Sequence, residues 1–263
     1  MKNLFLFFFI ILFLSCEVGE DFVPDNPIDP INPDYEKPEV EFISAPSDLE
    51  ILQDPVFEFA WNGNAENMIY RFSFDGEWSD WEEERTSVTI NHMDEGSHTF
   101  AVQSKYTNDD TSSVISSTFI VDAVKGSSLM IYPRKFSAES GQEFEIYLMA
   151  EEVSDLAAAE VQLSFDVSMI EIVDVEVGDI FEGVGEAIFI DDISRSGIIG
   201  ISAGVWGNDF PQVSGSKSIA KITLKAKSKG LSNISIDSKS ILRNPLNEQI
   251  EIIERVGGIV EIK

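Results

Sequence analysis

Apolar and polar residues alternate along most of this chain, and this alternation constrains its fold more than any other feature. It is clearest in EFEIYLMAEEV (143–153), AEVQLSFD (159–166), IEIVDVEV (170–177) and SIAKITLKAK (218–227). Successive side chains of a β-strand point to opposite faces of a sheet, so alternating apolar residues can all be buried on one face. No stretch keeps a helical period of apolar residues over three turns. The chain is therefore predicted to be all-β.

Polar turns rich in Gly, Asn and Asp separate these runs at intervals of about 8 to 12 residues, a spacing typical of antiparallel sandwiches. The stretch VKGSS at Val124–Ser128 interrupts two strand-rich halves. We therefore predict two β-sandwich modules, over residues 38–123 and 126–263. Further strands are expected at residues 56–61, 68–74, 87–91, 98–106, 116–121, 198–206, 232–237 and 257–262.

The chain begins with a charged residue, an apolar run and a lone cysteine. Lys2 precedes the run Leu4–Leu14, and the small residue Ser15 stands before Cys16, the only cysteine. This is the layout of a secretory signal over residues 1–15. The run is too short to cross a hydrocarbon core of about 30 Å as a helix.

Cleavage just before a lone cysteine resembles the bacterial lipoprotein signal. The resemblance implies acylation of Cys16, and several acyl chains together give lasting membrane attachment. The expected location is then the cell envelope of a Gram-negative bacterium, at the outer membrane or cell surface. The alternative is an ordinary secreted protein whose cysteine lies near the cleavage site by accident.

An acidic, proline-rich segment follows, and residues 17–38 hold five of the ten prolines. Proline removes backbone donors and like charges repel, so residues 16–37 are predicted to form an extended, disordered tether. Its aspartates lack the glycine-containing loop of a calcium site.

The charge is strongly negative and unevenly divided. Residues 1–124 hold 5 basic and 25 acidic residues, and residues 125–263 hold 13 and 22, giving nets of −20 and −9 within the total of −29. A negative field of this size repels phosphate groups, which argues against binding to nucleic acid or to anionic lipid headgroups.

The first module contains three tryptophans whose side chains could stack on sugar rings. The order of strands and turns, including DEGSHTFAVQS, resembles an immunoglobulin-like or fibronectin type III-like domain. Trp61 is predicted to lie in the core. Trp78 and Trp81 are three residues apart and would point to opposite faces of one strand, so they are not expected to form a flat sugar platform.

The second module carries a more specific resemblance. Phe165-Asp166-Val167, Ile170–Val173 and Val177-Gly178-Asp179 follow the order of a cohesin signature, as do GIIGISAGVW with SIAKITLKAK and the closing GGIVEIK. The resemblance spans nearly all of residues 126–263. It implies the jelly-roll-like sandwich of cohesins.

Local roles follow from the same residues. A change of phase near Val173 predicts a β-bulge, with Val173, Val175 and Val177 on the inner face after it. Asp166 is expected to accept backbone N–H groups in the following turn. Gly178 is expected to adopt a positive φ.

The cohesin resemblance also implies a partner, because cohesins bind dockerins, the calcium-loaded helical modules of polysaccharide-degrading enzymes. The chain itself is then expected to need no cofactor, with calcium only on the dockerin. Ala158 and Glu160 stand where the family often has Asn and Asp, and Ala158 lacks a hydrogen-bonding side chain. The predicted partner-binding residues lie on residues 156–165 and 199–206 and are Glu160, Gln162, Ser202, Gly204 and Trp206.

Motifs of catalysis are missing from the sequence. His92 and His98 are the only histidines, flank a turn and are expected to be solvated. No zinc-protease, nucleophile-elbow or phosphate-loop motif occurs, so we predict that the chain is not an enzyme. Two hypotheses from different classes remain, and a purely structural surface protein is a third possibility. The first is a monomeric surface adaptor that binds a dockerin-bearing protein, and the second is an accessory lipoprotein that binds polysaccharide directly.

Overall fold

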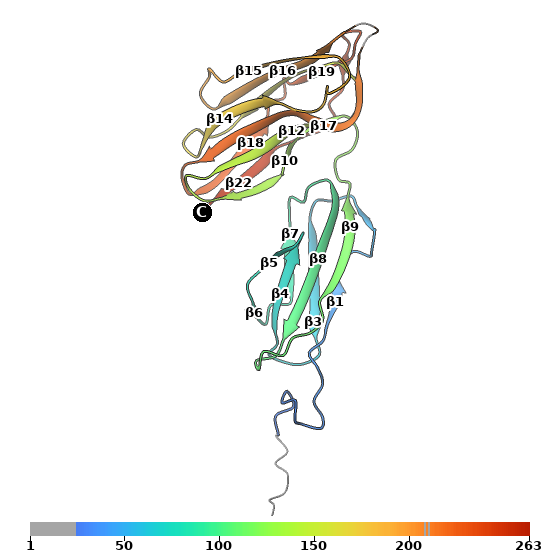
Figure 1. Ribbon diagram of the computed structural model, residues 1–263, viewed down its shortest axis with the longest axis vertical. Coiled ribbons are helices and arrows are strands. Elements are labelled where there is room, and N and C mark those ends of the chain that lie inside the picture. The colour runs from blue at the N-terminus through green and yellow to red at the C-terminus, as the bar shows by residue number, and fades with distance from the viewer. Residues whose placement is uncertain (1–24, 208, 210) are drawn as a thin grey trace, which may run out of the picture.

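The computed structural model describes residues 25–207, 209 and 211–263, and these residues form strands and turns without a helix. No helix in this part of the chain is therefore available to cross a membrane. Figure 1 shows two groups of strands, β1–β9 and β10–β22, joined end to end. Each group surrounds its own cluster of buried apolar residues. The prediction of an all-β sandwich protein is confirmed.

The first group packs a three-stranded sheet, β1-β3-β7, against a sheet of order β2-β9-β8-β4-β5, in which β6 also pairs with β4. Aromatic rings fill the space between them, and the rings of Phe59 and Phe100 stack with centroids 3.8 Å apart. Trp61 is 2% exposed, which confirms its place in the core. The strands are β1 (Val40–Ser44), β2 (Ile51–Leu52), β3 (Phe57–Gly63), β4 (Ile69–Phe74), β5 (Glu77–Trp78), β6 (Glu82–Glu83), β7 (Ser87–Ile90), β8 (Gly96–Lys105) and β9 (Ile115–Val121).

The second group also consists of two sheets, of order β14-β17-β12-β10-β21 and β11-β22-β18-β13-β16-β15, and β19 pairs with β13 and β20. Leu148 and Ile222 face Leu163 and Ile201 in one core. The strands are β10 (Ser128–Tyr132), β11 (Lys135–Ala138), β12 (Glu143–Leu156), β13 (Ala158–Ser164), β14 (Ile170–Val177), β15 (Glu186–Asp192), β16 (Ile198–Trp206), β17 (Val213–Ala226), β18 (Gly230–Ile236), β19 (Ile241–Arg243), β20 (Gln249–Ile250), β21 (Arg255–Val256) and β22 (Gly258–Ile262).

Strand β14 contains the predicted bulge, since its register against β17 shifts between Ile172 and Asp174. The inner-face prediction is only partly right, because Val175 packs on the core while Val173 and Val177 are 45% and 49% exposed. The extra residue turns its neighbours outward.

The turn before β14 also forms as predicted. Asp166 accepts a hydrogen bond from the backbone N–H of Ser168 at 2.8 Å. The hydroxyl and the backbone N–H of Ser168 lower the pKa of Asp166. The positive φ predicted for Gly178 is wrong. A Cβ there would lie 2.2 Å from the carbonyl oxygen of Ser218, so glycine is needed for a close approach of two backbones.

The segment before β1 differs from the predicted extended tether. Ile28 and Tyr35 pack against the first core. The side-chain amide of Asn108 donates to the carbonyl oxygen of Ile28 at 2.7 Å, and the Tyr35 hydroxyl donates to Asp110 at 3.0 Å. Two apolar side chains between the prolines are thus enough to fold residues 25–37 against the first group. Cys16 and the predicted signal lie outside the described residues.

Trp78, which is exposed, and Trp81, which is half-buried, share a cation, so the prediction that they face opposite ways is wrong. The guanidinium carbon of Arg71 lies 4.5 Å from the ring centroid of Trp78 and 4.6 Å from that of Trp81. Lys105 lies 5.0 Å from the Trp81 ring. Strand β5 ends at Trp78, and the turn that follows breaks the strand alternation.

His98 is buried rather than solvated, contrary to the sequence-based prediction, and is 7% exposed. Its Nδ1 lies 2.7 Å from the Asp75 carboxylate, and its Nε2 lies 2.8 Å from the Asp94 carbonyl oxygen. The alternation of β8 directs this ring inward, where it stacks on Phe74. His92 is only partly exposed and has a φ of 58°.

Two carboxylates join the groups of strands. The Asp94 carboxylate accepts the backbone N–H of Arg134 at 2.6 Å. The Glu95 carboxylate accepts the backbone N–H groups of Ala123 and Val124 at 3.0 and 3.2 Å, and lies 3.8 Å from the Arg134 guanidinium. These contacts hold the connecting segment and the start of the second group against the loop before β8. We call them the junction.

Burial raises the pKa of Asp94 and of Glu95 at this junction. A carboxyl group whose folded pKa is raised contributes stability that is present below its unfolded pKa, about 3.9 for Asp and 4.3 for Glu. That contribution is lost as the pH rises through the folded pKa. Acidification from pH 7 toward about 4.5 is therefore expected to stabilise the junction, and Asp94→Asn/Glu95→Gln should reduce this gain.

Urea unfolding of the native chain and of this variant at both pH values measures the difference. The control, Glu143→Gln/Glu171→Gln, removes two exposed carboxylates with the same loss of charge. Equal pH dependence in the junction variant and the native chain would contradict the expectation.

Candidate partner-binding groove

Four neighbouring strands, in the order β19, β13, β16 and β15, form the outer face on which the predicted residues lie. The antiparallel register places Ala158 opposite Gly204 and Glu160 opposite Ser202. On the other side of β16, the pairing with β15 places Ile188 opposite Gly204 and Ile190 opposite Ser202. Residues 42 and 46 positions apart in the sequence are thus direct neighbours on the sheet.

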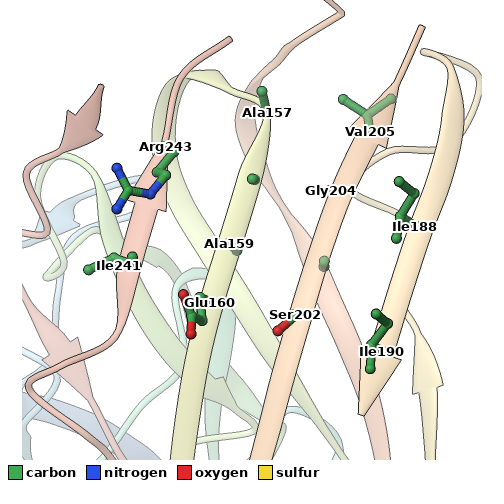
Figure 2. Close-up of a pocket in the computed structure, with 12 residues that line it drawn as sticks. Ala157, Ala159, Glu160, Ile188, Ile190, Ser202, Gly204, Val205, Ile241 and Arg243 are labelled. Carbon is green, nitrogen blue, oxygen red and sulfur yellow. The ribbon is translucent and has the colours of Figure 1, made fainter. Parts of the chain in front are cut away.

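A hollow of about 330 Å³ lies on this face, and we call it the groove. Its floor is low because the two middle strands carry the small residues Ala158 and Gly204 there. Figure 2 shows the larger side chains on either side. They are Ile188 and Ile190 on β15, and Ile241 and Arg243 on β19.

Polar groups stand beside the apolar floor. Glu160 and Ser202 line the groove, and among the described residues no side chain donates a hydrogen bond to the Glu160 carboxylate. Arg243 donates to the carbonyl oxygen of Asn247 at 3.0 Å through one nitrogen. The groove therefore combines an apolar floor with a carboxylate that is free to accept from a partner.

The same face continues into a second hollow of about 320 Å³, which shares Glu160, Ile190 and Ser202 with the groove. Here Gln162 accepts a hydrogen bond from Arg195 at 3.2 Å and donates one to Asp237 at 3.3 Å. Both ends of the Gln162 amide are occupied, so this side chain is held in one orientation.

The structure brings together most of the predicted partner-binding residues. Glu160, Ser202 and Gly204 line the groove, and Gln162 lines the adjoining hollow. Trp206 follows on the same strand and is 71% exposed, but it does not line either hollow. The role of these residues in binding stays a prediction.

Both walls of the groove lie on strands that were not expected from the sequence. Strand β15 was not predicted, although AIFI between acidic residues was its signal. Strand β19 is only three residues long and follows a polar turn. The apolar side chains that give the groove its depth therefore come from strands with little alternation.

Metal-binding chemistry is not supported by the residues that the structure describes. Within residues 25–207, 209 and 211–263, no three His, Cys, Asp or Glu side chains are grouped so that they could hold a metal ion.

Several solved structures are similar to this chain. A non-cellulosomal cohesin from Archaeoglobus fulgidus is 11% identical, with 53% of this chain and 92% of that chain covered and a TM-score of 0.45. The sixth cohesin of scaffoldin B from Acetivibrio cellulolyticus, solved with a Cel5 dockerin, is 15% identical, with 53% and 100% covered and a TM-score of 0.46. The seventh ScaB type I cohesin from Pseudobacteroides cellulosolvens is 21% identical, with 52% and 92% covered and a TM-score of 0.44.

No curated protein matches the chain. Residues 131–252 match the family model described as the Cohesin domain. The matched segment includes all four strands that form the groove. The C-terminal half of this protein therefore carries a cohesin domain.

Proposed function

We propose that the cohesin domain binds a dockerin-bearing protein through the groove, and that the chain acts as a non-catalytic adaptor at the cell surface. The observation that carries the proposal is the groove itself, on the face where the family resemblance implies a partner. Acylation of Cys16 would provide the anchor. The link to polysaccharide degradation comes from the kind of enzyme that dockerins accompany.

The chemistry of the groove indicates how a partner would be held. Small residues on the floor allow a helix to approach closely, and an aliphatic side chain from that helix can enter the hollow between Ile188 and Ile241. Glu160 can accept a hydrogen bond from a basic or hydroxyl side chain beside it. A few side chains buried in desolvated pockets carry most of the binding energy of a typical protein interface.

Filling the groove tests the proposal. Gly204→Leu places a branched side chain on the floor, where a Cβ has its nearest neighbour at 3.4 Å and therefore fits. We expect this variant to remain folded and to lose at least about 2 kcal/mol of partner binding, roughly thirtyfold in affinity. The probe is a purified dockerin-bearing protein from the source cells, titrated into the full chain with calcium and with EDTA.

The matched control is Leu231→Ala, which changes an exposed apolar residue of β18 away from the groove. Calcium-dependent binding that Gly204→Leu leaves unchanged would contradict the groove. Binding to polysaccharide that EDTA does not abolish, and that Trp206→Ala or Trp78→Ala weakens, would favour the alternative of a glycan-binding lipoprotein. Both tryptophans are exposed enough for stacking, at 71% and 40%.

A further inference from the structure

Strand β15 is an edge of its sheet, with β16 as its only partner among the described strands. Six of its seven residues are exposed, and only Phe189 is partly covered. Two of the exposed residues are large and apolar, since Ile188 is 47% and Ile190 is 62% exposed. An edge strand with apolar side chains on its outer face is well suited to pair with another extended segment.

The register identifies the backbone groups at this open edge. The N–H of Val205 donates to Ala157, so the odd-numbered residues of β16 direct their backbone groups to β13. The even-numbered residues, such as Gly204, then pair with β15, opposite Ile188. Along an antiparallel strand, the backbone N–H and C=O groups of successive residues point to opposite sides of the strand. The free N–H and C=O groups at the open edge are therefore those of Ala187, Phe189 and Asp191.

Several of the usual protections of an edge strand are missing here. Proteins commonly guard such strands with lysine, proline or a bulge. β15 has neither lysine nor proline, and its register against β16 runs without a shift. The acidic residues at its ends are the only charges that it carries.

Space for an added strand lies beside β15. A hollow of about 600 Å³ is lined by Ala187 from β15, by Val177 at the end of β14 and by the segment that follows it. Residues of β12 and β17 complete the lining, namely Tyr147, Ser218 and Lys221. Side chains on the inner side of an added strand would enter this hollow. Those on the outer side would lie beside Ile188 and Ile190.

Charge decides between a second copy of this chain and a different partner. In the antiparallel self-pairing with the greatest overlap, centred on Phe189, Glu186 of each copy faces Asp192 of the other, and like charges in cross-strand pairs are destabilising. Two cations lie nearby. Lys221 is bound by Glu145 and Glu176 at 2.9 and 3.2 Å, and Arg195 lies 4.0 Å from the carboxylate of Asp192, which leaves Glu186 and Asp191 for a partner. The open edge therefore favours a partner with positive charges at both ends of its paired segment.

We propose that β15 binds an extended segment of another protein by strand addition, and that this segment has an apolar centre flanked by lysine or arginine. The backbone groups of Ala187, Phe189 and Asp191 form the new ladder. Glu186 and Asp191 pair with the flanking cations. This site is the edge of the sheet and does not depend on the proposed function of the groove.

The probe for the test is a fluorescent nine-residue peptide in which valine and threonine alternate between two lysines at each end. Its binding to the full chain is followed by anisotropy, and amide hydrogen exchange is measured with and without the peptide. We expect slower exchange at Ala187, Phe189 and Asp191. Ala187→Pro removes one free N–H and should weaken binding about tenfold or more, because proline cannot join the new ladder. The matched variant Ala187→Ser should bind normally.

Charge reversal gives a test that leaves the backbone unchanged. Glu186→Lys/Asp191→Lys should weaken binding of the lysine peptide and favour a peptide with glutamates in the same places. Gly204→Leu should leave peptide binding intact, so failure at the edge and failure at the groove can be told apart. Three outcomes would each overturn the proposal. The Ala187→Pro variant could bind the peptide as well as the native chain does, or the peptide could slow amide exchange at residues outside β15 instead. The native chain could also form dimers that Ala187→Pro dissociates.

Discussion

Replacing Phe100 with alanine is expected to destabilise the first group of strands strongly and to leave the stability of the second group unchanged. Phe100 is fully buried, stacks on Phe59 and also contacts Phe42, Trp61 and Phe72. Truncation of such a residue costs about 3 to 5 kcal/mol, which is most of the stability of a domain of this size. Calorimetry of the full chain should show two transitions, with only one of them moved to lower temperature.

The complementary variant Leu148→Ala removes a buried side chain from the second core and should move only the other transition. A cost of about 2 to 5 kcal/mol is expected there. If either substitution moves both transitions together, the two cores unfold as one unit. The expectation of separate sandwich modules would then be wrong.

The substitution Gly178→Ala is expected to destabilise the second group by about 1 to 3 kcal/mol, the cost of forcing an extra methyl group into a packed site. The added Cβ would lie 2.2 Å from a backbone oxygen, which no side-chain rotation can relieve. Separating the two segments would also weaken the hydrogen bonds that the Asp179 carboxylate accepts from Ser218, at 2.9 Å from the backbone N–H and 2.6 Å from the hydroxyl.

Urea unfolding, monitored by far-ultraviolet circular dichroism, measures this loss of stability. Gly204→Ala serves as the matched control, because its added Cβ would have its nearest neighbours at 3.4 and 3.6 Å, an ordinary contact distance. A loss in the control as large as that in Gly178→Ala would show that any β-carbon in these sheets is costly.

The strands with regular alternation could be predicted from the sequence, because burial on one face leaves a period of two. The bulge in β14 was also visible, as a change of phase that the register against β17 confirms. Strand β15 was not visible, since both of its faces are largely exposed and no period arises. The pairing of Ala158 with Gly204, which creates the groove floor, depends on strand order, and a single sequence does not specify strand order.

Contacts that depend on the path of a turn were also missed. Trp78 and Trp81 both contact Arg71 because the chain turns after the two residues of β5. The alternation of side chains along a strand does not predict such a turn. The burial of His98 depends on Asp75, which is distant in the sequence, as well as on Asp94 in the turn just before it. The fold of Ile28 and Tyr35 onto the first core was hidden by the prolines around them.

The junction has a consequence for how a partner would encounter the groove. Figure 1 shows the described N-terminal residues at one end of the molecule and β15, β16 and β19 at the other. Hydrogen bonds from Arg134, Ala123 and Val124 to two carboxylates hold the groups of strands between these ends. The effective concentration of a tethered site depends on the match between its reach and the position of its partner. In a chain anchored at its N-terminus, the groove would therefore lie at a fixed distance from the membrane. It would bind best those partners that are held at a similar distance.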